Sequence, residues 1–162
     1  MQSINIEHKL AVLCRLAEEF NHQNLLWAVG ASLMLYFKGY VDDFSDLDLM
    51  VADKDALKME QILENAGTKL PTEKGSFETK HFRKFIVDFV EIDMIGGFAI
   101  VKNGKVYDCD LEEVQITDWT EVNGQKIPLQ SVDVWRNYYD LMGRTKKVAI
   151  IDGGSKWKQE NY

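Results

Sequence analysis

Hydrophobic residues follow helical spacing in some segments of the chain and form short apolar runs in others. In the first segment they recur at steps of four and three, which predicts an amphipathic helix over about residues 5–21 with the apolar positions Ile6, Leu10, Leu13, Ala17 and Phe20. Residues 25–29 form an apolar run of strand length. Residues 31–38 are apolar on nearly all sides, which predicts a short buried helix that stops at Gly39.

A second strand is predicted over residues 46–52, followed by a third helix. Asp53 is the expected N-cap of this helix and Gly67 marks its end. The expected inner face of the helix consists of Ala56, Met59, Leu63 and Ala66.

The second half of the chain predicts hairpins and then a helix. The expected strand pairs are residues 77–87 with 89–95, residues 99–101 with 105–107 across Asn103 and Gly104, and a hairpin around Gly124 between residues 120 and 128. Ser131 can cap a helix that runs to Leu141 and ends at Gly143. Residues 146–151 are compatible with either a helix or a buried strand.

Composition limits the classes of protein to consider. A chain of 162 residues, 46% hydrophobic, predicts one globular domain over residues 1–152, with residues 153–162 as a loosely held tail. The net charge of −7 argues against broad electrostatic capture of nucleic acid. Cys14 and Cys109 lack metal-type spacing, and no apolar run approaches a membrane span, so we expect a cytoplasmic protein with reduced thiols and no membrane contact.

Two short stretches carry the candidate chemistry. Gly30, Ala31 and Ser32 form a small-residue turn between the first strand and the helix after it, where free backbone N–H groups suit a phosphate. Asp46 and Asp48 lie two residues apart on the second strand, so both side chains point to one face. Adjacent carboxylates of this kind favour a shared hard cation such as magnesium.

A later strand repeats the arrangement of Asp46 and Asp48. Glu91 and Asp93 alternate with Val90, Ile92 and Met94, so the apolar side chains face the core and the two carboxylates face the other way. If the two strands are neighbours, four carboxylates share one face of the sheet.

At this point the sequence resembles the nucleotidyltransferase superfold, which includes DNA polymerase beta and the small lincosamide and aminoglycoside nucleotidyltransferases. The signature is a hydrophobic residue, Gly, and Gly or Ser, then a spacer and Asp-hydrophobic-Asp/Glu-hydrophobic. The matching residues are Val29, Gly30 and Ser32, then Asp46, Leu47, Asp48 and Leu49, preceded by Ser45. Ala31 departs from the signature, because it displaces Ser32 by one position.

The resemblance implies an α+β fold with a mixed sheet, helices packed on one side, and additional β-hairpins. It also implies that Asp46 and Asp48 bind two magnesium ions and that Asp93 supplies the third metal-binding carboxylate, with Glu91 as the alternative. Gly30, Ala31 and Ser32 would hold the phosphates of a nucleoside triphosphate such as ATP. A substrate hydroxyl would then attack the α-phosphate while Asp93 or Glu91 took its proton.

Cations that could contact the triphosphate are less distinctive, since basic side chains are mostly solvated. The candidates are Arg83, Lys84, Lys102, Arg144 and Lys146.

The acidic charge favours a small-molecule acceptor over nucleic acid, as in the antibiotic nucleotidyltransferases, and the resemblance allows a homodimer. Two alternatives stay open. One is a nucleotidyltransferase-like antitoxin that acts as an interaction protein in a toxin–antitoxin pair, and the other is a member of the fold that binds nucleotide without catalysis.

Overall fold

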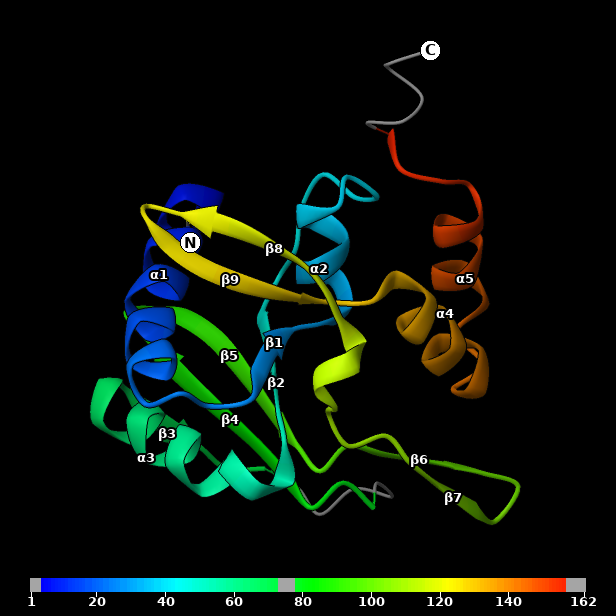
Figure 1. Ribbon diagram of the computed structural model, residues 1–162, viewed down its shortest axis with the longest axis horizontal. Helices are drawn as coiled ribbons and strands as arrows, with labels where there is room; N and C mark the ends of the chain where they lie inside the picture. Colours follow the sequence, from blue (N-terminus) through cyan, green and yellow to red (C-terminus); the bar gives the residue numbers. More distant parts are fainter. Residues whose placement is uncertain (1–3, 73–77, 157–162) are drawn as a thin grey trace.

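A mixed sheet forms the centre of the computed structural model, which describes residues 4–72 and 78–156 (Figure 1). Its seven strands have the order β3-β4-β5-β2-β1-β9-β8. The strands are β1 (Trp27–Val29), β2 (Leu47–Val51), β3 (Thr68–Leu70), β4 (His81–Val87), β5 (Val90–Gly96), β8 (Ile116–Val122) and β9 (Gln125–Gln130). The β1–β9 and β2–β5 pairs are parallel and the other pairs are antiparallel.

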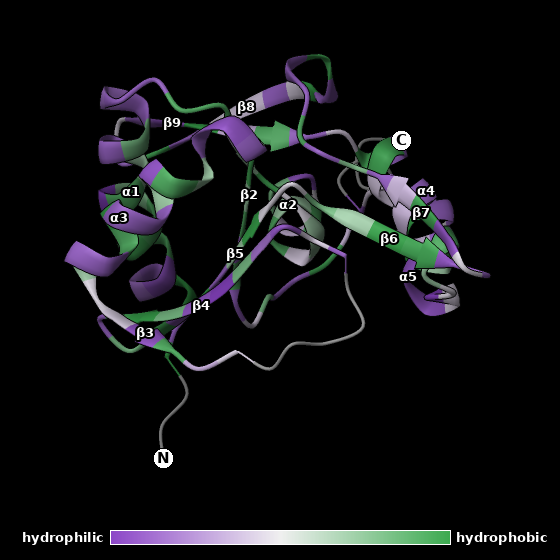
Figure 2. Cartoon of the chain, turned by 90° about the horizontal axis from the view of Figure 1, so that it is seen from below, coloured by the Kyte–Doolittle hydropathy of each residue, from purple (hydrophilic) through white to green (hydrophobic). Residues whose placement is uncertain are grey.

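Helices α1 (Ile6–His22) and α3 (Ala56–Ala66) pack on one side of this sheet, as predicted, and both contribute buried residues to the core. Both helices contact sheet strands as well as each other. Figures 1 and 2 place α4 (Val132–Leu141) and α5 (Thr145–Asp152) on the side away from α1 and α3, with α2 (Ala31–Phe37) between the two groups. The α+β class, the mixed sheet and the additional hairpins are therefore confirmed.

Two of the expected hairpin turns have the backbone that their residues favour. A separate two-stranded sheet, β6 (Ala99–Lys102) with β7 (Lys105–Asp108), turns at Asn103 and Gly104, which have φ of 54° and 76°. This pair of left-handed residues is typical of the tightest hairpins. The β8–β9 hairpin turns in the same way at Asn123 and Gly124.

The structure corrects or completes several local predictions. The N-cap of α3 is Asp55 rather than Asp53, because a short 3-10 turn (Asp53–Asp55) precedes the helix. Ile62 completes the buried face of α3, whereas Ala66 is exposed. Strand β3 was not predicted, and β4 begins at His81, with the predicted start of that strand at residue 77 outside the described residues. Residues 145–152 are a helix, which resolves the open alternative.

The end of the described chain lies against the loop after α2. The Ser155 hydroxyl donates to the backbone oxygen of Lys38, and the Lys156 backbone N–H donates to that of Gly39, both at 2.8 Å. The rest of the predicted tail, residues 157–162, lies outside the described residues. Among the helices of ranges 4–72 and 78–156, none is both long enough and apolar enough to cross a membrane.

Candidate active site

The parallel pairing of β2 with β5 brings the two acidic stretches together. Asp48 lies opposite Asp93, and Leu47 lies opposite Ile92. Because side chains alternate along a strand, the carboxylates occupy one face while Leu47 and Ile92 are fully buried on the other. Asp46, just before β2, shares a side-chain hydrogen bond with Glu91. The structure therefore places all four predicted carboxylates on one face of the sheet.

Burial and mutual repulsion oppose ionisation of these carboxylates. Burial, followed by the charges of Asp93 and Asp46, raises the pKa of Asp48 from 3.8 to about 8. Burial, the hydrogen bond with Glu91 and the charge of Asp93 raise the pKa of Asp46 to about 6. Burial also raises the pKa of Asp93, although the nearby Lys84 ammonium opposes that effect.

These carboxylates fit a divalent cation chemically. A dication between Asp48 and Asp93 would replace their repulsion by attraction, and oxygen ligands are the kind that magnesium prefers. Over residues 4–72 and 78–156, no three Asp, Glu, His or Cys side chains form a ready-made metal cage. Magnesium commonly keeps waters and substrate phosphates as further ligands, so a complete protein cage is not required.

The turn at Gly30 and Ala31, where α2 begins, lies beside this acidic face. A Cβ atom on Gly30 would lie 2.7 Å from the Trp135 ring and 2.9 Å from the Met50 side chain, so only glycine fits. Ala31 has φ of +52°, a left-handed backbone that disfavours residues other than glycine. Ala31, which departs from the nucleotidyltransferase signature, thus lies where the backbone is strained.

Ser32 joins this turn to α5. The Lys147 ammonium donates to the Ser32 hydroxyl at 2.8 Å, and Tyr139 of α4 also has a side-chain hydrogen bond with Ser32. Burial, followed by the charge of Arg144, lowers the pKa of Lys147, while the charge of Asp48 opposes that effect. Ser32 therefore contacts an ammonium group on which the charges of Arg144 and Asp48 also act.

A cavity of about 370 Å³ connects these groups. Its polar wall contains Ala31, Ser32, Ser45, Asp46, Asp48, Thr79, Arg144 and Lys147. Its apolar wall contains Phe82, Ile95, Phe98, Trp135, Tyr139 and Met142. Asp93 and Glu91 lie next to the two aspartates on the sheet but outside this lining.

Of the basic residues predicted to contact the triphosphate, the structure places Arg144 at the cavity, and it adds Lys147. Arg144 lines the cavity, whereas Lys102 and Lys146 are exposed and Arg83 is paired with Glu60. Lys84 contacts Asp93. Lys147 was missed, although a helix over residues 145–152 places it near Arg144 on one face, because residues three apart are neighbours on a helix.

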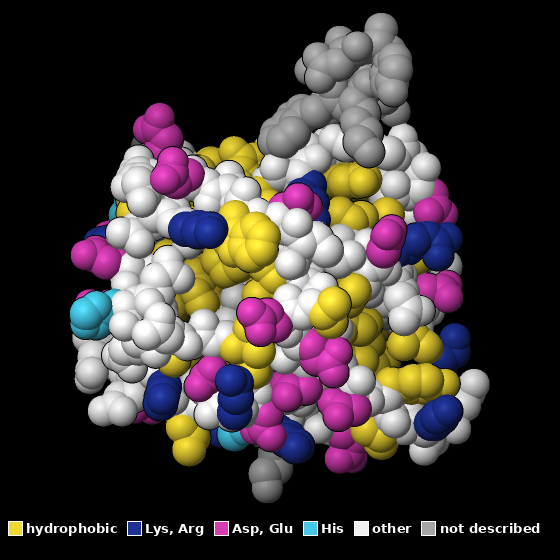
Figure 3. Space-filling model, in the orientation of Figure 1, with side chains coloured by type: hydrophobic (Ala, Val, Ile, Leu, Met, Phe, Trp, Pro, Cys, Tyr) yellow, Lys and Arg dark blue, Asp and Glu magenta, His cyan; other side chains and the backbone are white. Residues whose placement is uncertain are grey.

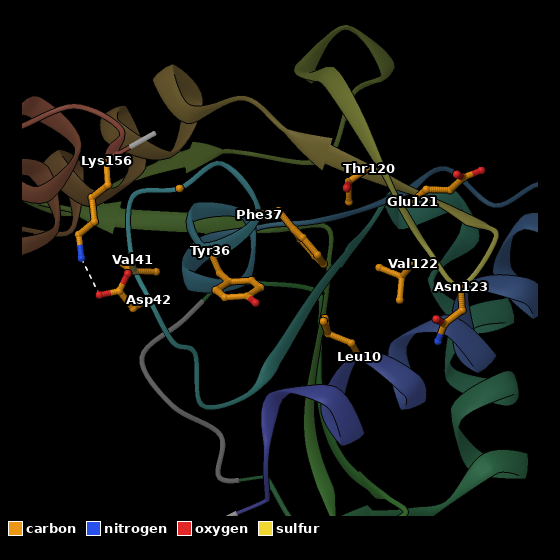
Figure 4. Close-up of a pocket in the computed structure, with 11 residues that line it drawn as sticks. Leu10, Tyr36, Phe37, Val41, Asp42, Thr120, Glu121, Val122, Asn123 and Lys156 are labelled. Carbon is orange, nitrogen blue, oxygen red and sulfur yellow. Dashed lines mark hydrogen bonds and ion pairs between the residues drawn. The ribbon is translucent and has the colours of Figure 1, made fainter. Parts of the chain in front are cut away.

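A larger hollow of about 560 Å³ lies elsewhere, between α1, α2 and β8 (Figure 4). Leu10, Tyr36, Phe37 and Val122 point into it, and Asp42 at its edge is ion-paired with Lys156 at 2.6 Å. It lacks the paired carboxylates and the Ser32–Lys147 contact of the smaller cavity, so the candidate chemistry belongs to the smaller one.

The sheet order, the strand–turn–helix at Gly30 and the facing carboxylates define a nucleotidyltransferase fold. Comparison with solved structures agrees. A candidate nucleotidyltransferase from Thermotoga maritima matches with a TM-score of 0.73 and 21% identity over 98% of each chain. The aminoglycoside enzyme ANT(2″)-Ia, solved with adenylyl-2″-tobramycin, has a TM-score of 0.59 and 11% identity, covering 88% of this chain and 87% of that one.

The lincosamide antibiotic adenylyltransferase LnuA, solved with lincomycin, has a TM-score of 0.57 and 13% identity over 85% of this chain and 87% of its own. No family model and no curated protein matches the sequence. At these identities the structural likeness shows the fold alone.

Proposed function

We propose that this protein is a magnesium-dependent nucleotidyltransferase that moves a nucleoside monophosphate from a nucleoside triphosphate to a hydroxyl of a small molecule. The observation that carries the proposal is the pairing of Asp48 with Asp93 beside a cavity that also contains Ser32 and Lys147. The solved relatives with tobramycin and lincomycin support the class of acceptor.

Asp46, Asp48 and Asp93 would hold magnesium ions, which neutralise charge on the transferring phosphate and orient the attacking oxygen when bound. We assign the third ligand to Asp93 rather than Glu91, because Asp93 lies directly opposite Asp48 and is partly buried. Glu91 is exposed at the margin of the site.

The triphosphate would lie along the polar wall of the cavity. Lys147 and Arg144 offer positive charge there, and the Ser32 hydroxyl and the Gly30–Ser32 turn offer hydrogen bonds. The acceptor oxygen would form a bond to the α-phosphorus as the bond to the leaving pyrophosphate breaks. Asp93 would take the hydroxyl proton, with Glu91 next to it as the alternative.

The acceptor is proposed to be a small molecule because the protein is acidic. The net charge is −7, and acidic side chains gather at the lower centre of the face shown in Figure 3. The segment between β7 and β8 adds Asp110, Glu112 and Glu113 to this charge. Such a surface repels a polyanion.

We also propose that the protein acts in the cytoplasm, and that a second copy of the chain completes the acceptor side of the cavity.

A test combines nucleotide binding with product detection. Calorimetry with magnesium and a non-hydrolysable ATP analogue should show binding, and mass spectrometry should detect nucleotidylated products in a panel of hydroxyl-bearing acceptors incubated with each nucleoside triphosphate. Asp48→Asn and Asp46→Asn should lower transfer by at least about a hundredfold, because charge stabilisation supplies most of the catalysis.

Asp43→Asn is the matched control, since Asp43 lies on the same loop but is exposed and outside the cavity. It should keep the wild-type rate. Unchanged transfer by Asp48→Asn, or the absence of magnesium-dependent nucleotide binding in the wild type, would refute the proposed function.

A further inference from the structure

One lysine contacts the carboxylate face from the neighbouring strand. Lys84 of β4 lies opposite Asp93 of β5, which in turn lies opposite Asp48 of β2. The three residues thus form one row across the sheet, with the cation at one end. The Lys84 ammonium lies 3.5 Å from the Oδ1 atom of Asp93.

Lys84 is held less firmly than Arg83, its neighbour on β4. Its side chain is 42% exposed, whereas that of Asp93 is 16% exposed. Besides the ion pair with Asp93, the Lys84 ammonium lies 5.8 Å from the centre of the Phe82 ring, at the edge of the cavity. By contrast, Arg83 donates both to Glu60 and to a backbone oxygen. A long side chain held by one partly exposed ion pair can turn to a new anionic partner when such a partner binds nearby.

The partner of Lys84 is also the carboxylate to which we assign a metal. This argument rests on the proposed function. An ammonium and a divalent cation repel each other, so each weakens the binding of the other to Asp93. The positive charge of Lys84 also acts on Asp46 and Asp48, so Lys84 is a counter-ion of all three aspartates.

We propose that Lys84 is an exchangeable counter-ion of Asp93, which weakens metal binding in the nucleotide-free protein and releases Asp93 when metal and triphosphate bind together. The negative charge of the nucleotide then attracts the released ammonium. Tight metal binding therefore requires the nucleotide. While the cavity is empty, Lys84 partly neutralises the charge of the three aspartates.

The size of the effect follows from the charges. A unit positive charge about 5 Å from a dication weakens its binding by roughly tenfold or more, even at a dielectric constant close to that of water. Removing the Lys84 charge should therefore tighten metal binding by at least about tenfold in the absence of nucleotide.

The experiment titrates the intact protein with Mn²⁺ and follows free Mn²⁺ by electron paramagnetic resonance, without nucleotide and at fixed ionic strength. Lys84→Met keeps the apolar stem and removes the charge, and Lys84→Gln repeats the test with a polar side chain. Both should bind Mn²⁺ at least about tenfold more tightly than the wild type. Lys84→Arg should stay within about twofold of the wild type, because the charge is retained.

Lys102→Met controls for net charge, since Lys102 is an exposed lysine on the β6–β7 hairpin. The role of Lys84 is overturned if Lys102→Met gains as much Mn²⁺ affinity as Lys84→Met. It is also overturned if neither Lys84→Met nor Lys84→Gln gains Mn²⁺ affinity. Adding Asp93→Asn to Lys84→Met should remove the gain, and its persistence would also overturn the proposal.

Repeating the titration with the ATP analogue separates this proposal from the function beneath it. If the wild type binds Mn²⁺ in the presence of the analogue, but Lys84→Met binds Mn²⁺ no more tightly than the wild type in its absence, only the role of Lys84 is refuted. If no variant binds Mn²⁺ with or without the analogue, both proposals fail.

Discussion

Replacing Asp48 by asparagine should stabilise the metal-free protein while it removes activity. Asp48 is partly buried beside Asp93 and Asp46, and its pKa is raised to about 8 in the folded protein from 3.8. Between these two values the folded protein keeps a proton that the unfolded chain releases. Stability from this group is therefore complete below pH 3.8 and is lost as the pH rises through about 8.

The asparagine side chain cannot ionise, so the substitution removes this pH-dependent loss. The stability advantage of the variant should grow by up to about 1 kcal/mol per pH unit between pH 5 and pH 8 and level off above that range. For a protein of this length, each kcal/mol corresponds to about 2–4 °C in the melting temperature. At pH 7 we expect the variant to melt several degrees above the wild type.

Thermal unfolding in EDTA at pH 5, 6, 7, 8 and 9 measures the effect, with Asp43→Asn as an exposed carboxylate control. Saturating magnesium should stabilise the wild type and leave Asp48→Asn almost unchanged, because a ligand that binds only the folded state raises its stability. The reasoning is refuted if the advantage of Asp48→Asn is flat between pH 5 and pH 8, or if it shrinks as the pH rises.

Three further substitutions test the walls of the site by urea unfolding. Ala31→Gly should stabilise the protein by about 0.5–1 kcal/mol, because glycine adopts the left-handed backbone of this position without strain. Ala66→Gly, at the exposed end of α3, is the control and should destabilise the protein. Equal effects of the two substitutions would show that the backbone at Ala31 is not strained. Gly30→Ala should destabilise it by about 1–3 kcal/mol because the new methyl group meets Trp135, and no loss would show that the ring can yield. Gln130→Leu should cost about 1–3 kcal/mol because the Trp135 indole N–H loses its 2.8 Å acceptor; a neutral result would indicate another partner.

Local sequence patterns predicted the elements well where each residue's role depends on near neighbours. The helical spacing from Ile6 to Phe20 and the Asn103-Gly104 turn gave α1 and the β6–β7 hairpin almost to the residue. The likeness of Gly30 and Asp46 to a known signature predicted the fold, because the signature joins local turns to a known sheet order.

What the sequence could not supply depends on contacts between distant segments. Asp53 looks like a helix cap, but its carboxylate pairs instead with Lys80 and His81, which lie 27 and 28 residues away along the chain. Lys147 reaches Ser32 across 115 residues, so no spacing rule identifies it. Strand β3 has three residues with little apolar pattern and exists because β4 pairs with it.

The two walls of the cavity are built on opposite physical principles. The Trp135 indole N–H donates to buried Gln130, which donates in turn to Gln115, so these polar groups of the apolar wall have hydrogen-bond partners. The acidic wall contains Asp48, and burial together with the charge of Asp93 on the neighbouring strand opposes its ionisation. A site made only for stability would neutralise that wall, as Asp48→Asn does. A charged Asp48 fits the proposed function, in which cations and phosphate complete this wall.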